Sequence, residues 1–219
     1  LCVSYSGQCY VSQHCFGRSA NRGECAQFCR LKFDMIDSDG RMIEQGRHLL
    51  SLKDMNRGAD LERLLDAGVT SLKIEGRLKD VAYVKNVTAW YRSRLDEIFK
   101  RRPEYRRASS GQVSLAFTPC LEKSFNRGFT RYFLDGRTPD IFSFHTPNSL
   151  GEEVGTVKEV RGKCIVVSGV KPFANGDGLC FLDEQGNLQG FRVNRVEANK
   201  IYPAEMPRVR PHARLYRNF

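Results

Sequence analysis

The 219-residue sequence predicts a mixed fold of the α+β or α/β class, in which a β/α unit precedes a small antiparallel β-barrel. Three observations support this prediction. Residues 60–102 follow the order helix, strand, helix, whereas residues 151–219 contain short apolar stretches separated by turn residues. Between them, residues 103–150 are interrupted by prolines and a Ser-Ser-Gly run, as connectors are. We therefore expect a first domain over 1–102, a connector over 103–150 and a barrel domain over 151–219.

The first domain begins with residues 1–30, which lack periodicity and are expected to form an irregular loop. Residues 31–35 alternate apolar and polar side chains before the turn sequence Asp37-Ser38-Asp39-Gly40, which predicts a hairpin. Asp60 is expected to cap a helix over 61–67 that ends at Gly68. Residues 69–75 then predict a strand.

A long helix is predicted from about residue 79 to residue 102, because Pro103 cannot continue it. Its apolar stripe has spacings of three and four and comprises Val84, Val87, Tyr91, Leu95 and Ile98. Functional groups of β/α barrels lie at the carboxyl ends of strands. Lys73, Glu75 and Arg77 occupy alternate positions at that end of the predicted strand, so they are candidates for substrate contact. A structural ion pair is the alternative.

The barrel domain is predicted from six short strands of regular spacing. Their expected ranges are 154–160, 164–168, 179–182, 190–196, 200–202 and 214–216. The segment Asp183-Glu184-Gln185-Gly186-Asn187 predicts a hairpin turn between two of them.

The net charge of +10 favours a polyanionic partner, of which RNA is the first candidate. Arg127 and Arg131 lie among aromatic residues, and such a pattern can stack and neutralise unpaired nucleotides. Alternatively, Phe125, Phe129 and Phe133 are spaced by four and could form one apolar helical face. No apolar run is long enough to span a membrane, and the sequence does not indicate an oligomeric state.

The cysteines are concentrated at the start of the chain, where five of the eight fall within the first 29 residues. Cys2, Cys9, Cys25 and Cys29 follow the pattern C-x6-C-x15-C-x3-C. Thiolates bind zinc or iron–sulfur clusters, and the wide, uneven spacing favours a cluster over a zinc knuckle. Zinc, or thiols with a redox or structural role, are the alternatives. Such thiols persist in a reducing compartment, so we expect a cytoplasmic protein.

Arg18 and Arg22 lie in the same cysteine-rich segment. A cluster bound by four thiolates is negatively charged, so these guanidinium groups could stabilise it. They could equally contact an RNA phosphate.

Three sequence runs resemble peptidase family U32, the collagenase-like family. They are residues 1–12, residues 18–30 and residues 71–79 with the following Tyr83 and Val84, and the resemblance covers about 1–102. Residues 125–129 and 176–179 resemble the branch that contains the bacterial hydroxylase of cytidine in 23S ribosomal RNA.

The resemblance implies the C-terminal part of a β/α-barrel-like domain, and we expect a fragment that lacks the N-terminal half. It also implies a 4Fe–4S cluster held by Cys2, Cys9, Cys25 and Cys29, and oxygen-independent hydroxylation of ribosomal RNA, tRNA or quinone precursors. In the RNA cases it implies prephenate as a further participant. The family label implies a peptidase, although the chain has no recognisable catalytic triad. A zinc-stabilised RNA- or protein-binding module is the non-enzymatic alternative.

Overall fold

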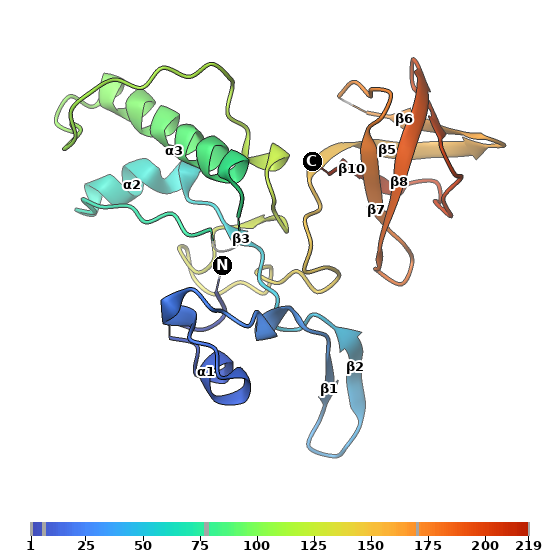
Figure 1. Cartoon of the computed structure of the whole chain (residues 1–219), viewed down its shortest axis with the longest axis horizontal. Helices are drawn as coiled ribbons and strands as arrows, with labels where there is room; N and C mark the ends of the chain where they lie inside the picture. The colour runs from blue at the N-terminus through green and yellow to red at the C-terminus, as the bar shows by residue number, and fades with distance from the viewer. Residues whose placement is uncertain (1, 6–7, 77–78, 170, 219) are drawn as a thin grey trace.

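The structure is a computed structural model that describes residues 2–5, 8–76, 79–169 and 171–218 (Figure 1). The helical segments are α1 (Tyr10–Phe16), η1 (Ala20–Arg22), η2 (Phe28–Arg30), η3 (Gly58–Asp60), α2 (Leu61–Asp66), α3 (Val81–Arg101) and η4 (Leu121–Lys123), where η denotes a 3-10 turn. The first strands are β1 (Phe33–Ile36), β2 (Met42–Arg47), β3 (Asp54–Met55) and β4 (Phe129–Thr130). The remaining strands are β5 (Glu152–Arg161), β6 (Cys164–Ser168), β7 (Gly178–Leu182), β8 (Leu188–Glu197), β9 (Lys200–Pro203) and β10 (Arg214–Arg217).

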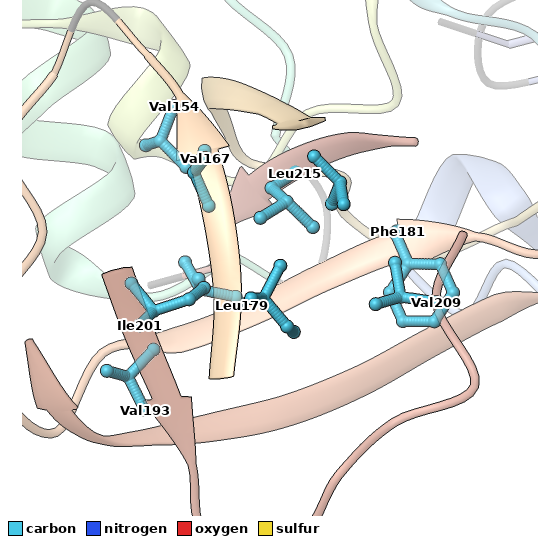
Figure 2. Packing of buried hydrophobic residues seen from close by; sticks show 10 residues of the cluster. Val154, Val167, Leu179, Phe181, Val193, Ile201, Val209 and Leu215 are labelled. Carbon is cyan, nitrogen blue, oxygen red and sulfur yellow. The ribbon is translucent and has the colours of Figure 1, made fainter. Parts of the chain in front are cut away.

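The C-terminal strands close into a barrel in the order β10-β5-β6-β9-β8-β7, with antiparallel neighbours throughout. The prediction of a small antiparallel barrel is confirmed. Apolar side chains from all the barrel strands form one core (Figure 2), and β6 and β7 bury several consecutive residues. That core comprises Val154, Val157, Ile165, Val167, Leu179, Phe181, Val193, Ile201, Val209 and Leu215.

The predicted turn between β7 and β8 is also confirmed. The backbone N–H of Asp183 donates to the carbonyl of Asn187 at 2.9 Å, and Oδ1 of Asp183 accepts from the N–H groups of Gln185 and Asn187. This side-chain pairing with the local backbone explains why aspartate begins the turn.

The predicted hairpin and long helix are present. β1 and β2 pair antiparallel and project from the rest of the chain (Figure 1). α3 begins at Asp80, whose carboxylate accepts from the N–H of Tyr83 at 2.7 Å. Val87 and Ile98 of the predicted stripe are buried, but Val84 is 52% exposed. None of the helices in the described part of the chain combines the length and apolar character of a membrane span.

The strand predicted over 69–75 is wrong. These residues have no regular structure, and those at 70–75 are exposed. A strand requires a neighbour with which to pair, and no described segment pairs with this one. The parallel pair in this part of the structure is instead formed by β3 and β4, each two residues long.

Two smaller predictions are also wrong. Phe125, Phe129 and Phe133 do not share a helical face, because Phe129 belongs to β4 and positive φ angles at Gly128 (80°) and Tyr132 (50°) interrupt any helix there. Asp60 does not cap α2 through its side chain. Its carboxylate is paired with an arginine instead.

Candidate metal centre and its cationic neighbours

Cys9 immediately precedes α1, a short helix in a segment that the sequence predicted to be irregular. The helix ends at Gly17, whose left-handed backbone (φ 61°) returns its N–H to the carbonyl of Gln13. Ser12, in the centre of the helix, is completely buried. Its Oγ donates to the carbonyl of Arg18 at 2.7 Å and accepts from the N–H of Ala26 at 3.0 Å. Ser12 therefore ties the Cys9 helix to the segment that carries Cys25.

Cys25 and Cys29 lie in a tight loop. Gln27 adopts a left-handed backbone (φ 55°), and its N–H lies 3.4 Å from Sγ of Cys25. Hydrogen bonds of this kind to sulfur stabilise a thiolate and tune a bound cluster. Phe28 contacts the rings of Phe16 and Phe33 at centroid distances of 5.9 and 4.9 Å, which anchors η2 and therefore Cys29.

Two of the four predicted thiols, Cys2 and Cys25, act electrostatically on a third, Cys29. Burial raises the pKa of the Cys29 thiol, Arg30 opposes this rise, and Cys2 and Cys25 add to it. All eight cysteines are free thiols. Within the described residues, however, no three His, Cys, Asp or Glu side chains are close enough together to bind a metal ion. The free thiols have the donor chemistry of a thiolate-bound metal, but the part of the chain that the structure describes does not bring them together as a closed ligand set.

A group of cations lies beside Cys29. Arg30, Lys79 and Arg127, with the carboxylate of Asp54, are called here the cationic cluster. Nη2 of Arg127 lies 2.5 Å from Oδ1 of Asp54, and its backbone N–H donates to Oδ2 at 3.0 Å. Nε of Arg127 and Nη1 of Arg30 both donate to the carbonyl of Leu52, at 3.1 and 3.3 Å. Segments far apart in the chain thus position these charges.

Lys79 lies next to Arg127 in the cationic cluster because both contact the ring of Phe125. Its Nζ lies 3.0 Å from the ring centroid of Phe125, and the guanidinium of Arg127 lies 5.2 Å from the same centroid. Burial lowers the pKa of Lys79, the charge of Arg127 lowers it further, and Asp54 opposes both. Burial likewise lowers the pKa of Arg127, while Asp54 and the Cys29 thiolate act in the opposite direction. Three cations and the carboxylates of Asp54 and Asp80 leave a net positive charge beside Cys29, which favours an anion there.

A family model described as Peptidase family U32 matches residues 1–142. The chain belongs to peptidase family U32. It is 48% identical to the 23S rRNA 5-hydroxycytidine C2501 synthase of Escherichia coli, over 100% of this chain and 35% of that protein. It is 31% identical to the tRNA hydroxylation protein P1 of Bacillus subtilis, over 72% of this chain and 38% of that protein. A collagenase of Porphyromonas gingivalis is 35% identical over 63% of this chain and 37% of its own length.

The chain therefore spans about a third of the length of these curated U32 relatives. The comparison with solved structures found no match.

The predicted basic residues of this U32 chain lie in different environments. Arg18 and Arg22 are exposed on the cysteine-rich segment. Arg127 is buried in the cationic cluster. Arg131 forms an ion pair with the buried Asp60, with its Nε 3.0 Å from Oδ2. The structure brings Arg127 close to Cys29 but leaves the other three outside the cationic cluster.

The candidates at the end of the predicted strand do not form a site. Lys73 and Glu75 are 2.9 Å apart and form an ion pair in an exposed segment without regular structure. The alternative of an ion pair is therefore observed for these two residues. Arg77 lies outside the described residues.

Asp54 and Lys79 were missed by reasoning from the sequence. Asp54 pairs with a residue 73 positions away, so no local pattern indicates its role. Lys79 is the last residue of the U32 sequence run at 71–79, and that position was the one available signal.

Proposed function

We propose that this U32 protein takes part in the hydroxylation of ribosomal RNA or tRNA, and that it does so with an iron–sulfur cluster. The observation that carries the proposal is the 48% identity, over the whole of this chain, to a protein named for ribosomal RNA cytidine hydroxylation. A second relative, named for tRNA hydroxylation, matches 72% of the chain. The names of these two relatives refer to different RNAs, ribosomal RNA and tRNA, and this supports RNA as the substrate class.

Cys2, Cys9, Cys25 and Cys29 would hold the cluster. Four thiols without disulfides, an N–H directed at Cys25 and a positive excess beside Cys29 support this assignment. When bound, a 4Fe–4S cluster supplies one-electron transfer. The cationic cluster would balance the negative charge of that centre, or orient a carboxylate co-substrate such as prephenate. Free thiols of this kind are consistent with a cytoplasmic location.

The RNA itself would be held mainly through phosphate contacts. The net charge of +10 favours such contacts in general. Arg18 and Arg22 are exposed beside the cysteine segment, so they are the arginines we assign to the RNA backbone near the centre.

Mass spectrometry of RNA nucleosides in a deletion strain tests this function. We expect a hydroxylated nucleoside to disappear on deletion of the gene and to return with the wild-type gene. Cys29→Ala should fail to restore it, because one proposed ligand is lost. Cys15→Ala is the matched control, since Cys15 is an exposed cysteine outside the proposed set. A nucleoside profile that deletion leaves unchanged would refute RNA hydroxylation.

Peptidase activity is the second candidate, because a collagenase of Porphyromonas gingivalis W83 is 33% identical over 99% of this chain. Gelatin cleavage that survives alanine at all four proposed ligand cysteines would favour it. Zinc in place of iron and sulfide would favour a zinc-stabilised binding module.

A further inference from the structure

A pocket of about 440 Å³ opens where β3 and β4 end against α3. We call it the Trp90 pocket. It is lined by Asn56, Gly58, Ala59, Trp90, Arg94, Phe129, Thr130 and Arg131. Its volume is in the range of sites that bind small molecules or single nucleotides. The pocket lies at the carboxyl ends of a parallel strand pair, which is the end that bears function in β/α barrels.

Trp90 is held firmly in this wall. A side chain on Gly58 would place its Cβ 2.0 Å from the indole ring, so glycine is what allows the ring to lie against the backbone. The guanidinium of Arg94 lies 5.1 Å from the indole centroid. Oδ1 of Asn56 accepts from the N–H of Gly58 at 2.9 Å and from the hydroxyl of Tyr91 at 3.3 Å, which fixes the amide at the pocket wall.

The charges around the pocket are largely compensated. Arg131 is paired with Asp60 and with Asp135, and Arg94 lies 3.2 Å from Glu97. The interior therefore offers aromatic and amide surface more than free positive charge. Such a lining suits a flat, neutral heterocycle better than a phosphate. The half-exposed Arg94 and Arg131 could still bind a phosphate next to that heterocycle.

The same two strands connect the pocket to the cationic cluster. Asp54 begins β3, and Asn56 follows its last residue and still bonds to β4, its N–H donating to the carbonyl of Thr130 at 3.0 Å. Arg127 precedes β4, whose residues Phe129 and Thr130 line the pocket. A ligand in the Trp90 pocket would thus lie one short strand away from the charges beside Cys29.

We propose that the Trp90 pocket binds an unpaired nucleobase of the RNA substrate, with Trp90 and Phe129 as its aromatic surface. This inference rests on the proposed function, because RNA is the ligand class it invokes. An unpaired base can be stacked on an aromatic side chain and bonded along its edge, whereas a base inside a helix cannot reach such a site. The rim arginines, Arg94 and Arg131, would contact the flanking phosphates.

Trp90 itself reports on this binding, because it is the one tryptophan of the sequence. We expect saturable quenching of its fluorescence when the chain is titrated with cytidine 5′-monophosphate or with a short single-stranded oligocytidine. A duplex of the same length should quench about tenfold less effectively, since its bases are not available for stacking. If neither cytidine 5′-monophosphate nor the single-stranded oligocytidine quenches the fluorescence of Trp90, the proposal is overturned. This test requires no variant.

A blocking variant locates the site. Ala59 is exposed and lines the pocket, so Ala59→Phe should fill its mouth and lower oligocytidine affinity by about tenfold or more. Ala67→Phe is the matched control, because Ala67 is exposed and lies outside the pocket lining; its affinity should stay within about twofold of wild type. Quenching that Ala59→Phe leaves unchanged would place binding elsewhere and refute the pocket.

These outcomes are separable from those of the proposed function. Suppose that Ala59→Phe abolishes base binding but that deletion of the gene leaves the RNA nucleosides unchanged. This result would support the pocket and refute hydroxylation. Loss of the hydroxylated nucleoside on deletion, without quenching of Trp90, would support hydroxylation and refute the pocket.

Discussion

Arg127 is a buried guanidinium whose partners are one carboxylate and one carbonyl. Replacement by methionine removes the charge and the hydrogen bond that Arg127 donates to Asp54. We expect Arg127→Met to lower the free energy of unfolding by roughly 1–3 kcal/mol, because Asp54 loses a charged hydrogen-bond donor. Urea unfolding at neutral pH measures this loss. Arg22→Met, at an exposed arginine, should change it by less than about 0.5 kcal/mol.

The double variant provides a further check on this ion pair. Asp54→Asn combined with Arg127→Met should be less destabilising than the sum of the two single variants, because the remaining charge is also removed. Strict additivity would mean that the pair is not coupled.

Asp60 makes stability depend on pH. Its carboxylate is 2% exposed, and the hydrogen bond from Arg131 holds its pKa below the ordinary value of 3.8. The ionised group therefore contributes stability above its unfolded pKa, and this contribution is lost as pH falls through the folded pKa. We expect the difference in melting temperature between wild type and Asp60→Asn to be full above about pH 5 and to shrink on further acidification. A difference that is constant from neutral to acidic pH would contradict this.

Residues of distinctive chemistry could be selected from the sequence, but their partners could not. The four cysteines were selected from spacing and resemblance, and this assignment stays a prediction; Arg127 was selected as an RNA contact, but it is buried. Asp54 carries no local signal, and Lys79 was marked only by its place in the U32 run, since a tertiary contact between distant segments gives each its role.

At the scale of elements, Ser12 joins α1 to the loop that contains Cys25. Ser12→Ala leaves the N–H of Ala26 and the carbonyl of Arg18 without this buried partner. We expect a loss of about 1–3 kcal/mol in unfolding free energy and faster alkylation of Cys9 and Cys25, read out by mass spectrometry. Ser38→Ala, in the exposed hairpin turn, is the control. Equal alkylation rates in both variants would show that Ser12 does not position these thiols.

Elements with their own periodicity were predicted correctly, as α3 and the barrel strands show. The segment 69–75 has the composition of a strand but no described neighbour to pair with, so the prediction failed. β3 and β4 are too short to give any periodic signal, although they position both the cationic cluster and the Trp90 pocket.

At the scale of the whole molecule, the barrel is the part with the clearest apolar core. Phe181 is 2% exposed and belongs to this core together with Val209 (Figure 2). Phe181→Ala should lower the free energy of unfolding by roughly 3–5 kcal/mol, since it removes a large buried ring and leaves a cavity. Phe117→Ala, at a 46% exposed position, is the control. Similar losses for both variants, measured by urea unfolding, would contradict this account of the core.

The barrel was predictable because its short apolar strands are separated by segments rich in turn residues. The path of residues 103–150 was not, because hydrogen bonds such as that from the N–H of Leu150 to the carbonyl of Asn126 depend on the assembled structure. The family resemblance therefore indicated the chemistry of the cysteine segment, and the structure added its cationic neighbours.

The most direct measurement is the iron and acid-labile sulfide content of the protein purified without oxygen. We predict equal amounts of iron and sulfide with broad visible absorption, retained in Cys15→Ala and lost in Cys29→Ala. A colourless protein without iron, or an iron content that Cys29→Ala leaves unchanged, would contradict the assignment of these cysteines to one cluster.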